Sequence, residues 1–283
     1  MYNTPVNKKQ NYFLISIRLQ TMSSYINSKT IVFIHGLFMN PASWSNWIKF
    51  FKEKGYICYA PAYAFHEGNP SDLRGNINPG LGKITFGQVI DSLIELIDGF
   101  SEEPILIGHS MGGLAVQKLI ELNKGMAGIC IDPAPPKGIN SFKWSFLKAN
   151  LPTINPLKGN SVCLPSVKWF RYAFCNTMTI EQTEIEYNKF VVPESRNIPR
   201  TSTKKDGKID FKKPHNPLLI IAGEKDNIVP SSLNKKNFEA YLDNNSKIDF
   251  KEFKGRTHYI CGQDKWEEVA NYSFNWIMSL RQE

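Results

Sequence analysis

The chain has 283 residues, of which 42% are hydrophobic and 12% aromatic, which is enough for a buried core and excludes a disordered protein. Its formal charge is +8, but the basic pairs are dispersed and no nucleic-acid-binding motif accompanies them, so we expect no nucleic-acid partner. No apolar run approaches the roughly 20 residues that a membrane helix needs, so the sequence predicts no membrane span.

The N-terminal segment, residues 1–27, is expected to form a tail ahead of the folded core. Arg18 interrupts the apolar run in "NYFLISIRLQ", and no small-residue cleavage site follows it, so we expect no export signal. Met22 stands only a few residues before the first convincing strand, and both Met1 and Met22 are candidate starts of the native chain.

The five cysteines bear on the compartment and on metal binding. Their number is odd, their spacing is wide and no C-x-x-C pair occurs. This pattern favours free thiols in a reducing, cytoplasmic location and argues against structural zinc. A disulfide between Cys163 and Cys175 is the alternative.

Strands and helices are expected to alternate along most of the chain. Short β-branched runs that stop at Gly or Pro predict strands, and apolar residues at helical spacing between capping signals predict helices. Asn40-Pro41 and the capping box of Thr85 and Gln88 are two such signals. In chain order, the expected elements are a strand at 30–36, a helix at 42–55, a strand at 56–63, a loop to about 84, a helix at 86–100, a strand at 104–108, a helix at 111–125, strands at 126–132 and 217–223, a helix at 231–245, a strand at 247–253 and a helix at 266–280.

This alternation predicts an α/β fold with a mainly parallel central sheet flanked by helices, because parallel neighbours need crossover helices. Ligands in such sheets bind at the carboxyl ends of the strands. Residues 134–213 break the alternation with many prolines and aromatic residues, which predicts a mostly helical insertion with an apolar underside and a polar, solvated exit at 193–213. The insertion is either a satellite domain with its own core or a lid over a site on the sheet. The expected organisation is a tail at 1–27, a core at 28–133, the insertion at 134–213 and the second part of the core at 214–283.

The stretch "PILIGHSMGG" contains the pattern G-x-S-x-G at Gly108, Ser110 and Gly112. A pattern with three fixed positions occurs by chance in about one chain of this length in ten. The neighbouring elements therefore have to show whether this one is functional. Ser110 lies between an expected strand and an expected helix, which is the context of a nucleophile elbow. The glycines permit a turn in which Cβ atoms would collide with backbone, and the turn aims the Ser110 hydroxyl beyond the strand end.

A serine hydroxyl is a poor nucleophile until a base takes its proton. His258, in "KGRTHYICG", lies in a loop after the last core strand, from which it could reach Ser110. Asp226, in "LLIIAGEKDNIVP", is the preferred carboxylate to orient the imidazole, with Glu224 as the fallback. The alternatives are a surface-loop histidine and an acid that caps a helix or stabilises its own loop.

Backbone N–H groups complete the candidate site as an oxyanion hole. Met111 follows the serine, and Leu37 follows the strand that ends in "FIHGLF". Trp44 either flanks the pocket or is an ordinary core aromatic. The candidate pocket residues are Phe38, Trp144, Trp169 and Phe170.

The segments "HGLF", "GHSMGG", "GEKDNIVP" and "GRTHY" together resemble the four landmarks of the α/β-hydrolase fold superfamily, over residues 28–133 and 214–281. The resemblance implies a serine nucleophile with a Ser110–Asp226–His258 triad, and it implies that 134–213 is the variable cap. A serine at this position disfavours dehalogenases and epoxide hydrolases, which use aspartate, and dienelactone-type enzymes, which use cysteine.

The function expected from these features is hydrolysis of carboxylic esters or lactones of small to medium apolar substrates through an acyl-enzyme. The triad needs no cofactor or metal, and the protein is expected to be a monomer or homodimer. The alternatives are other chemistry by the same triad, on thioesters, amides, carbon–carbon bonds or acyl acceptors, and a hydrolase-like receptor that binds a ligand without useful turnover.

Overall fold

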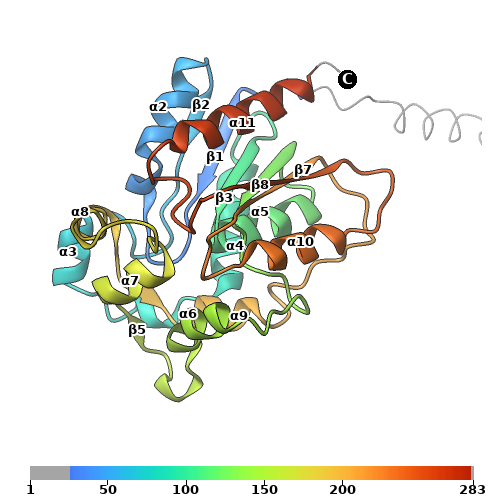
Figure 1. Ribbon diagram of the computed structural model, residues 1–283. Helices are drawn as coiled ribbons and strands as arrows, with labels where there is room; N and C mark the ends of the chain where they lie inside the picture. The colour runs from blue at the N-terminus through green and yellow to red at the C-terminus, as the bar shows by residue number, and fades with distance from the viewer. Residues whose placement is uncertain (1–25, 282–283) are drawn as a thin grey trace, which may run out of the picture.

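Six parallel strands form the central sheet in the computed structural model, which describes residues 26–281 (Figure 1). The expected tail at 1–27 and the choice between Met1 and Met22 therefore lie almost wholly outside the described residues. The sheet order is β2-β1-β3-β4-β7-β8, and every neighbouring pair is parallel. The strands are β1 Thr30–Ile34, β2 Ile57–Tyr59, β3 Ile105–His109, β4 Ala127–Ile131, β7 Leu218–Gly223 and β8 Ile248–Phe253.

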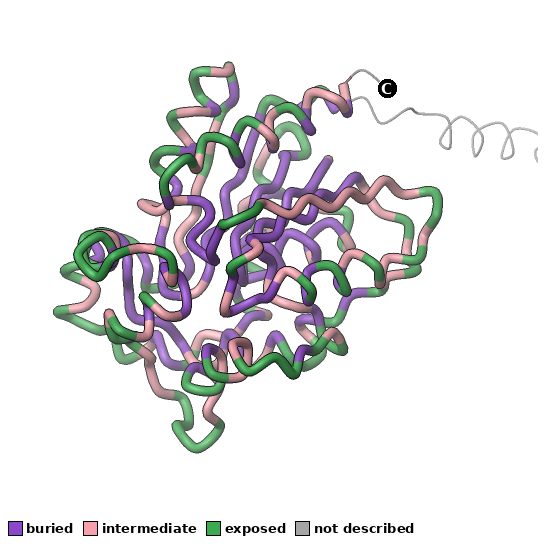
Figure 2. The backbone as a smooth tube through the Cα atoms, viewed as in Figure 1, coloured by how far each residue is buried: buried purple, intermediate pink, exposed green. Residues whose placement is uncertain are grey.

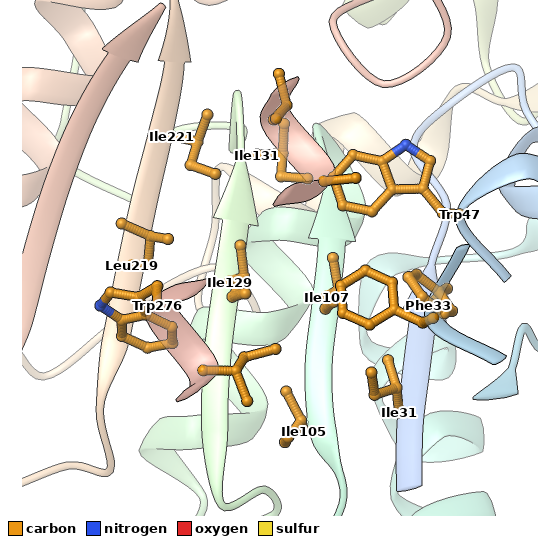
Figure 3. Close-up of a cluster of buried hydrophobic side chains, with 14 of the residues drawn as sticks. Ile31, Phe33, Trp47, Ile105, Ile107, Ile129, Ile131, Leu219, Ile221 and Trp276 are labelled. Carbon is orange, nitrogen blue, oxygen red and sulfur yellow. The ribbon is translucent and has the colours of Figure 1, made fainter. Parts of the chain in front are cut away.

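Helices cover both faces of this sheet, as the alternation predicted. Ile31 and Phe33 of β1 pack on one face, whereas Val32 and Ile34 pack on the other, because successive side chains of a strand point to opposite sides. The first face is covered by α2 (Ser45–Glu53) and α11 (Trp266–Ser279), and Figure 3 shows its core. The second face is covered by α4 (Phe86–Asp98), α5 (Met111–Glu121) and α10 (Ser231–Glu239). Burial on both faces explains why the central strands are almost uninterrupted apolar runs.

The strand order reverses between β1 and β3. The chain runs outward from β1 to its neighbour β2 and then returns to the other side of β1 as β3. Ligands in open α/β sheets bind at such switch points, outside the carboxyl ends of the strands. The loop after β1 and the turn after β3 both lie at this place.

The segment expected to be a loop, residues 61–84, is more ordered than the sequence interpretation allowed. It contains helix α3 (Pro70–Gly75) and the 3-10 turn η2 (Leu81–Lys83). Asn69 caps α3 and Pro70 starts it, which is the same Asn-Pro signal that begins the 3-10 turn η1 (Pro41–Trp44) at Asn40. The signal was present in the sequence, but the surrounding glycines and prolines obscured it.

The insertion at 134–213 is mostly helical, with a short antiparallel pair of strands. Its elements are α6 Trp144–Ile154, η3 Pro156–Lys158, β5 Val162–Cys163, α7 Val167–Ala173, α8 Ile180–Phe190, β6 Glu194–Ser195 and α9 Asn197–Ser202. An apolar cluster lies beneath it and includes Phe170, Phe174 and Val191 together with Phe38 and Val229 of the core.

The expectation of a solvated exit at 193–213 is wrong for its first part. Ser195 and Ile198 are fully buried, and α9 packs against α4, where Thr201 Oγ1 accepts a hydrogen bond from the Phe86 N–H at 2.8 Å. Polar side chains in this stretch bond to backbone groups rather than to solvent alone. The alternative disulfide is also wrong, since Cys163 and Cys175 are both free thiols.

Within residues 26–281, none of the helices combines the length and the apolar character needed to cross a bilayer.

Replacing Thr85 by Ala removes the side-chain oxygen that accepts a hydrogen bond from the Gln88 N–H at the start of α4. We expect the free energy of unfolding to fall by about 1 kcal/mol, measured by urea denaturation. The matched control is Thr177→Ala, at an exposed turn position outside any helix, where we expect a change within about 0.5 kcal/mol. Equal losses in the two variants would contradict a capping role.

Candidate functional site

Ser110 occupies the sharp turn between β3 and α5. Its φ of 56° is in the left-handed region, which a non-glycine residue adopts only under constraint. A Cβ at Gly108 would lie 2.2 Å from the carbonyl oxygen of Gly112, and one at Gly112 would lie 2.1 Å from that of Ile34. These two close backbone contacts explain why both flanking positions are glycine.

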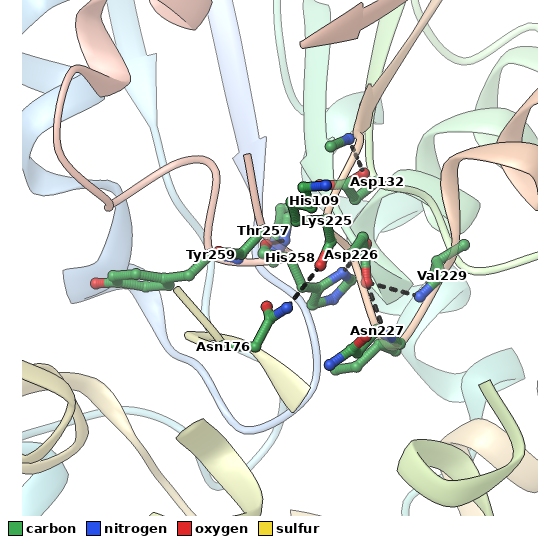
Figure 4. Close-up of polar contacts among 12 residues, drawn as sticks. His109, Asp132, Asn176, Lys225, Asp226, Asn227, Val229, Thr257, His258 and Tyr259 are labelled. Atoms are coloured by element: carbon green, nitrogen blue, oxygen red, sulfur yellow. Dashed lines mark hydrogen bonds and ion pairs between the residues drawn. The ribbon is translucent and has the colours of Figure 1, made fainter. Parts of the chain in front are cut away.

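His258 and Asp226 lie in direct contact in the loops that follow β8 and β7 (Figure 4). The distance from His258 Nδ1 to Asp226 Oδ2 is 2.6 Å, and both side chains are fully buried. The other carboxylate oxygen, Oδ1, accepts hydrogen bonds from the N–H groups of Ile228 at 2.7 Å and Val229 at 2.8 Å. Burial raises the pKa of Asp226, whereas the hydrogen bonds from Val229 and Ile228 oppose this shift. Together with His258, these donors also orient the carboxylate.

One ring nitrogen of His258 is free to accept a proton. Because Nδ1 donates its proton to Asp226, the lone pair is on Nε2, and Nε2 has no hydrogen-bond partner in the described part of the chain. Burial lowers the pKa of His258 to about 3, which favours the neutral ring that can accept a proton.

The backbone ties this histidine to the serine turn. His109, the residue before Ser110, donates from Nε2 to the carbonyl oxygen of His258 at 2.8 Å, and the two rings lie 4.7 Å apart. The structure thus places His258 and Asp226 in contact, 32 positions apart in the chain (258 − 226), and ties the His258 backbone to the residue before Ser110. Within the described residues, His258 Nε2 makes no hydrogen bond to the Ser110 hydroxyl. Glu224, the fallback acid, instead accepts a hydrogen bond from the Gly255 N–H at 2.9 Å and pairs with Lys254, so it does not contact His258.

The loop after β1 supplies an unpaired amide beside the turn. The Leu37 N–H makes no hydrogen bond to any group of residues 26–281. Met111 is the first residue of α5, where an amide has no acceptor one turn earlier. Gly36 lies against the serine turn, since a Cβ at Gly36 would stand 2.8 Å from Cβ of Ser110.

The apolar cluster under the insertion reaches the histidine. Phe174 lies edge-on to His258 with ring centroids 4.8 Å apart, and it stacks on Phe170 at 4.8 Å. The rings of Phe38 and Trp169 contact each other edge to face, with centroids 5.3 Å apart. Three of the four candidate pocket residues therefore lie in or against one cluster, which reaches His258 through Phe174.

Trp144 and Trp44 lie elsewhere. Trp144 is 74% exposed at the start of α6, so it does not line an enclosed pocket. Trp44 is buried in the sheet core against Phe33, with ring centroids 5.1 Å apart. It belongs to the core that supports the first face of the sheet.

The sequence profile of the alpha/beta hydrolase family matches residues 31–272. The chain belongs to this family. Among solved structures, it is similar to a monoacylglycerol lipase of Paleococcus ferrophilus, at 21% identity and a TM-score of 0.63 over 89% of this chain and 94% of that one. It is similar to an extracellular alpha/beta-hydrolase of a Paenibacillus species, at 19% identity and a TM-score of 0.65 over 87% and 98%.

A methylesterase from Arabidopsis is also similar, at 15% identity and a TM-score of 0.61 over 88% of this chain and 98% of that one. At these identities the likeness shows the fold alone. A comparison with curated proteins gave no match.

In this alpha/beta hydrolase the structure adds Asp132, which sequence reasoning missed. It follows β4, so it stands at the same edge of the sheet as Ser110 and Asp226. Its Oδ1 accepts a hydrogen bond from the Gly223 N–H at 2.7 Å, and its Oδ2 has no partner among the described residues. Burial, with the charge of Asp226 as a second cause, raises the pKa of Asp132, which favours its neutral form. An acid directly after a strand was the signal that could have found it.

Asp132, His109 and His258 could in principle ligate a metal, since one ligand atom from each lies within 4.8 Å of the others. Each of the three already makes a hydrogen bond at one of its ligand atoms. Burial lowers the pKa of both histidines and raises that of Asp132, so it favours the uncharged forms of all three groups, which bring no negative charge to a cation. The chemistry of this donor set fits a hydrogen-bonded cluster better than a metal centre.

A second missed group supports the Leu37 loop of this family member. Glu194 of the insertion is almost completely buried and accepts hydrogen bonds from the Ser195 N–H at 2.7 Å and, more weakly, from the Phe38 N–H at 3.4 Å. His66 lies 3.6 Å from it and donates to the carbonyl of Pro193 at 3.0 Å. Burial raises the pKa of Glu194 to about 8. Nothing in the sequence distinguished this acid from the polar residues around it.

Glu194→Gln tests the burial of this carboxyl. With a pKa raised from 4.5 to about 8, native protein binds one more proton at Glu194 than unfolded protein between these pH values. The stability of the parent protein therefore falls as pH rises through this window, whereas the amide cannot ionise. Between pH 5 and pH 9, we expect the difference in the free energy of unfolding (Glu194→Gln minus parent) to rise by a few kcal/mol. Denaturant titration at each pH measures it. Parallel pH curves for the two proteins would contradict a buried neutral acid.

Asp132→Ala and Asp132→Asn separate a structural hydrogen bond from a charge. Alanine leaves the buried Gly223 N–H without an acceptor, so we expect a loss of about 1–3 kcal/mol in the free energy of unfolding. Asparagine keeps an acceptor oxygen and tolerates the φ of 42°, so we expect it to stay within about 1 kcal/mol of the parent. The measurement is chemical denaturation at neutral pH, and equal losses in both variants would show that Asp132 is needed as an ionised group.

Proposed function

We propose that the chain is a serine hydrolase that cleaves carboxylic esters or lactones of small to medium apolar substrates. The observation that carries the proposal is the buried 2.6 Å hydrogen bond between His258 and Asp226, which leaves Nε2 of the histidine unpaired. The backbone of this histidine is bonded to His109, the residue before a serine held at a positive φ. Nucleophile, base and orienting acid in this relation make up a catalytic triad.

Each residue has a defined step in the proposed reaction. His258 Nε2 removes the hydroxyl proton as Ser110 Oγ attacks the substrate carbonyl carbon. Asp226 holds the reactive tautomer and stabilises the imidazolium that forms. The amides of Leu37 and Met111 donate to the oxyanion of the tetrahedral intermediate. His258 then returns its proton to the leaving alcohol, and water repeats the sequence on the acyl-enzyme.

The apolar cluster supports the proposed substrate class. Phe38, Trp169 and Phe170 are aromatic and bring no charge to the site, which favours a neutral, apolar acyl or alcohol group. Trp144 is left out of this proposal because of its exposure. Two of the similar structures are named as a lipase and a methylesterase, which also fits ester cleavage.

We propose that residues 134–213 act as the cap over this site. Ser110 is only 6% exposed and His258 is fully buried, with Phe174 of the insertion against the imidazole. A substrate can reach the serine only when this aromatic cluster moves. The cap would thereby exclude water from the oxyanion and select the shape of the substrate.

Ser110→Ala tests the nucleophile. We expect the parent to hydrolyse p-nitrophenyl esters of graded acyl length and to react with a fluorophosphonate probe, and we expect the variant to lose the labelling and at least about a thousandfold in kcat. Asp226→Asn should lose at least about a hundredfold, because the amide favours the wrong imidazole tautomer. Glu224→Gln, two residues away, is the matched control and should keep full activity, because Glu224 does not contact His258.

Full esterase activity in Ser110→Ala would overturn the proposal. A labelled serine without turnover of any ester would keep the nucleophile but favour other triad chemistry or a ligand-binding role. Equal effects of Asp226→Asn and Glu224→Gln would contradict the assignment of the acid.

A further inference from the structure

Helix α6 and the residues just before it carry three of the insertion's exposed large apolar side chains; the others are Leu157, Leu164, Ile180 and Ile185. Phe142, just before this helix, is 91% exposed, and Trp144 and Leu151 on it are also exposed. Positions 144, 148 and 151 share one side of the helix by their spacing, whereas Ala149 and Thr153 are buried on the other side. Aromatic side chains of this size are rarely left in water on a surface without a partner.

This part of the chain is also free of acidic residues. From Pro133 to Ile180 the sequence contains neither Asp nor Glu. Its six cations are Lys137, Lys143, Lys148, Lys158, Lys168 and Arg171, and all six are exposed. Acids from outside this stretch lie near two of the cations, since Arg171 interacts with Glu181 and Lys143 lines a pocket together with Glu224. The stretch itself still carries six positive charges and no negative one.

Lys148 connects the apolar side chains of α6 to the basic side chains of α7, because it shares one side of α6 with Trp144 and Leu151 and also lines a groove with Lys168. A groove of about 600 Å³ joins Lys148 of α6 to Lys168 and Tyr172 of α7. The Lys148 ammonium lies 4.2 Å from the centre of the Tyr172 ring. We define Phe142, Trp144, Lys148, Leu151, Lys168 and Tyr172 as the α6–α7 face. Both helices lie in the insertion, at the lower part of Figure 1, and Figure 2 shows exposed backbone along this edge.

We propose that the α6–α7 face docks on the surface of an anionic phospholipid bilayer. Trp and Phe side chains prefer the boundary between headgroups and acyl chains, and lysines reach from the same surface to lipid phosphates. The lysines of the α6–α7 face, Lys148 and Lys168, complement an anionic leaflet. A second copy of the chain is a poorer occupant, because two such faces would bring like charges together.

Docking through this face would bring the membrane close to the candidate active site, an argument that rests on the proposed function. Helix α7 carries Phe170 on its buried side, and Phe174 directly after the helix touches His258. The surface that would meet the bilayer is thus the outer side of the helix that leads into Phe174, the residue against His258. An apolar ester dissolved in the membrane would enter beside this helix without crossing bulk water.

Flotation with lipid vesicles tests the docking, and Ser110→Ala protein is used so that binding is read without turnover. We expect binding to vesicles of equimolar phosphatidylglycerol and phosphatidylcholine, weaker binding to pure phosphatidylcholine, and release at about 1 M salt, where the Debye length is about 3 Å. Lys148→Gln with Lys168→Gln should weaken partitioning about tenfold or more, at about fivefold per charge. Phe142→Ser with Trp144→Ser should weaken it by a similar factor, and thermal unfolding confirms that these exposed changes leave the fold intact.

Matched controls remove charged and apolar side chains from the exposed surface outside the insertion. Lys49→Gln with Lys236→Gln removes two exposed charges on α2 and α10, and Leu242→Ser removes an exposed apolar side chain, so all should bind as the parent does. The proposal is overturned if the protein does not float with anionic vesicles, or if control and face variants lose binding equally. It is also overturned if light scattering shows a dimer that Phe142→Ser with Trp144→Ser converts to a monomer, since the face would then bind a second copy. Vesicle binding without esterase activity would support this inference and contradict only the proposed function.

Discussion

The buried hydrogen bond between His258 and Asp226 places the strongest constraint on this structure. A carboxylate removed from water is stable only when its oxygens have donors, and Asp226 has the amides of Ile228 and Val229 as well as the imidazole. Burial raises the pKa of Asp132, close beside it, and Asp132 accepts a hydrogen bond from the Gly223 N–H instead. The loops after β4, β7 and β8 thus meet at the hydrogen bonds of these two buried acids.

The insertion, in addition to the α/β core, shields the His258–Asp226 pair from water. The insertion adds Phe174 against the imidazole and Phe170 behind it, and both are buried. Its last part returns to the core as β6 and α9, where Glu194 bonds the loop of Phe38. The elements that would shape a substrate pocket are therefore the ones that exclude water from the hydrogen-bonded pair. The same insertion presents apolar and basic side chains outward, so one segment has two chemically different faces.

Much of the fold follows from local sequence patterns. Strands buried on both faces are continuous apolar runs, and the capping box of Thr85 and Gln88 starts α4 at the predicted residue. The pattern around Ser110 predicted the turn because only glycine tolerates the contacts at 108 and 112. The helix at Pro70 was missed, although its Asn-Pro start was visible, and the solvated exit was wrong because burial of 194–202 depends on contacts with α4, which is about a hundred residues away.

The sequence by itself determined the parallel α/β sheet, the serine turn and the candidate acid and base, because these depend on short-range periodicity and on residue types at strand ends. Only the tertiary structure decided that Asp226 and not Glu224 meets His258, since the two acids are two residues apart and differ in which way their loop turns. It also decided the raised pKa of Asp132, the burial of Glu194 and the exposure of Trp144. These properties depend on desolvation and on side-chain contacts with segments that are distant in the chain.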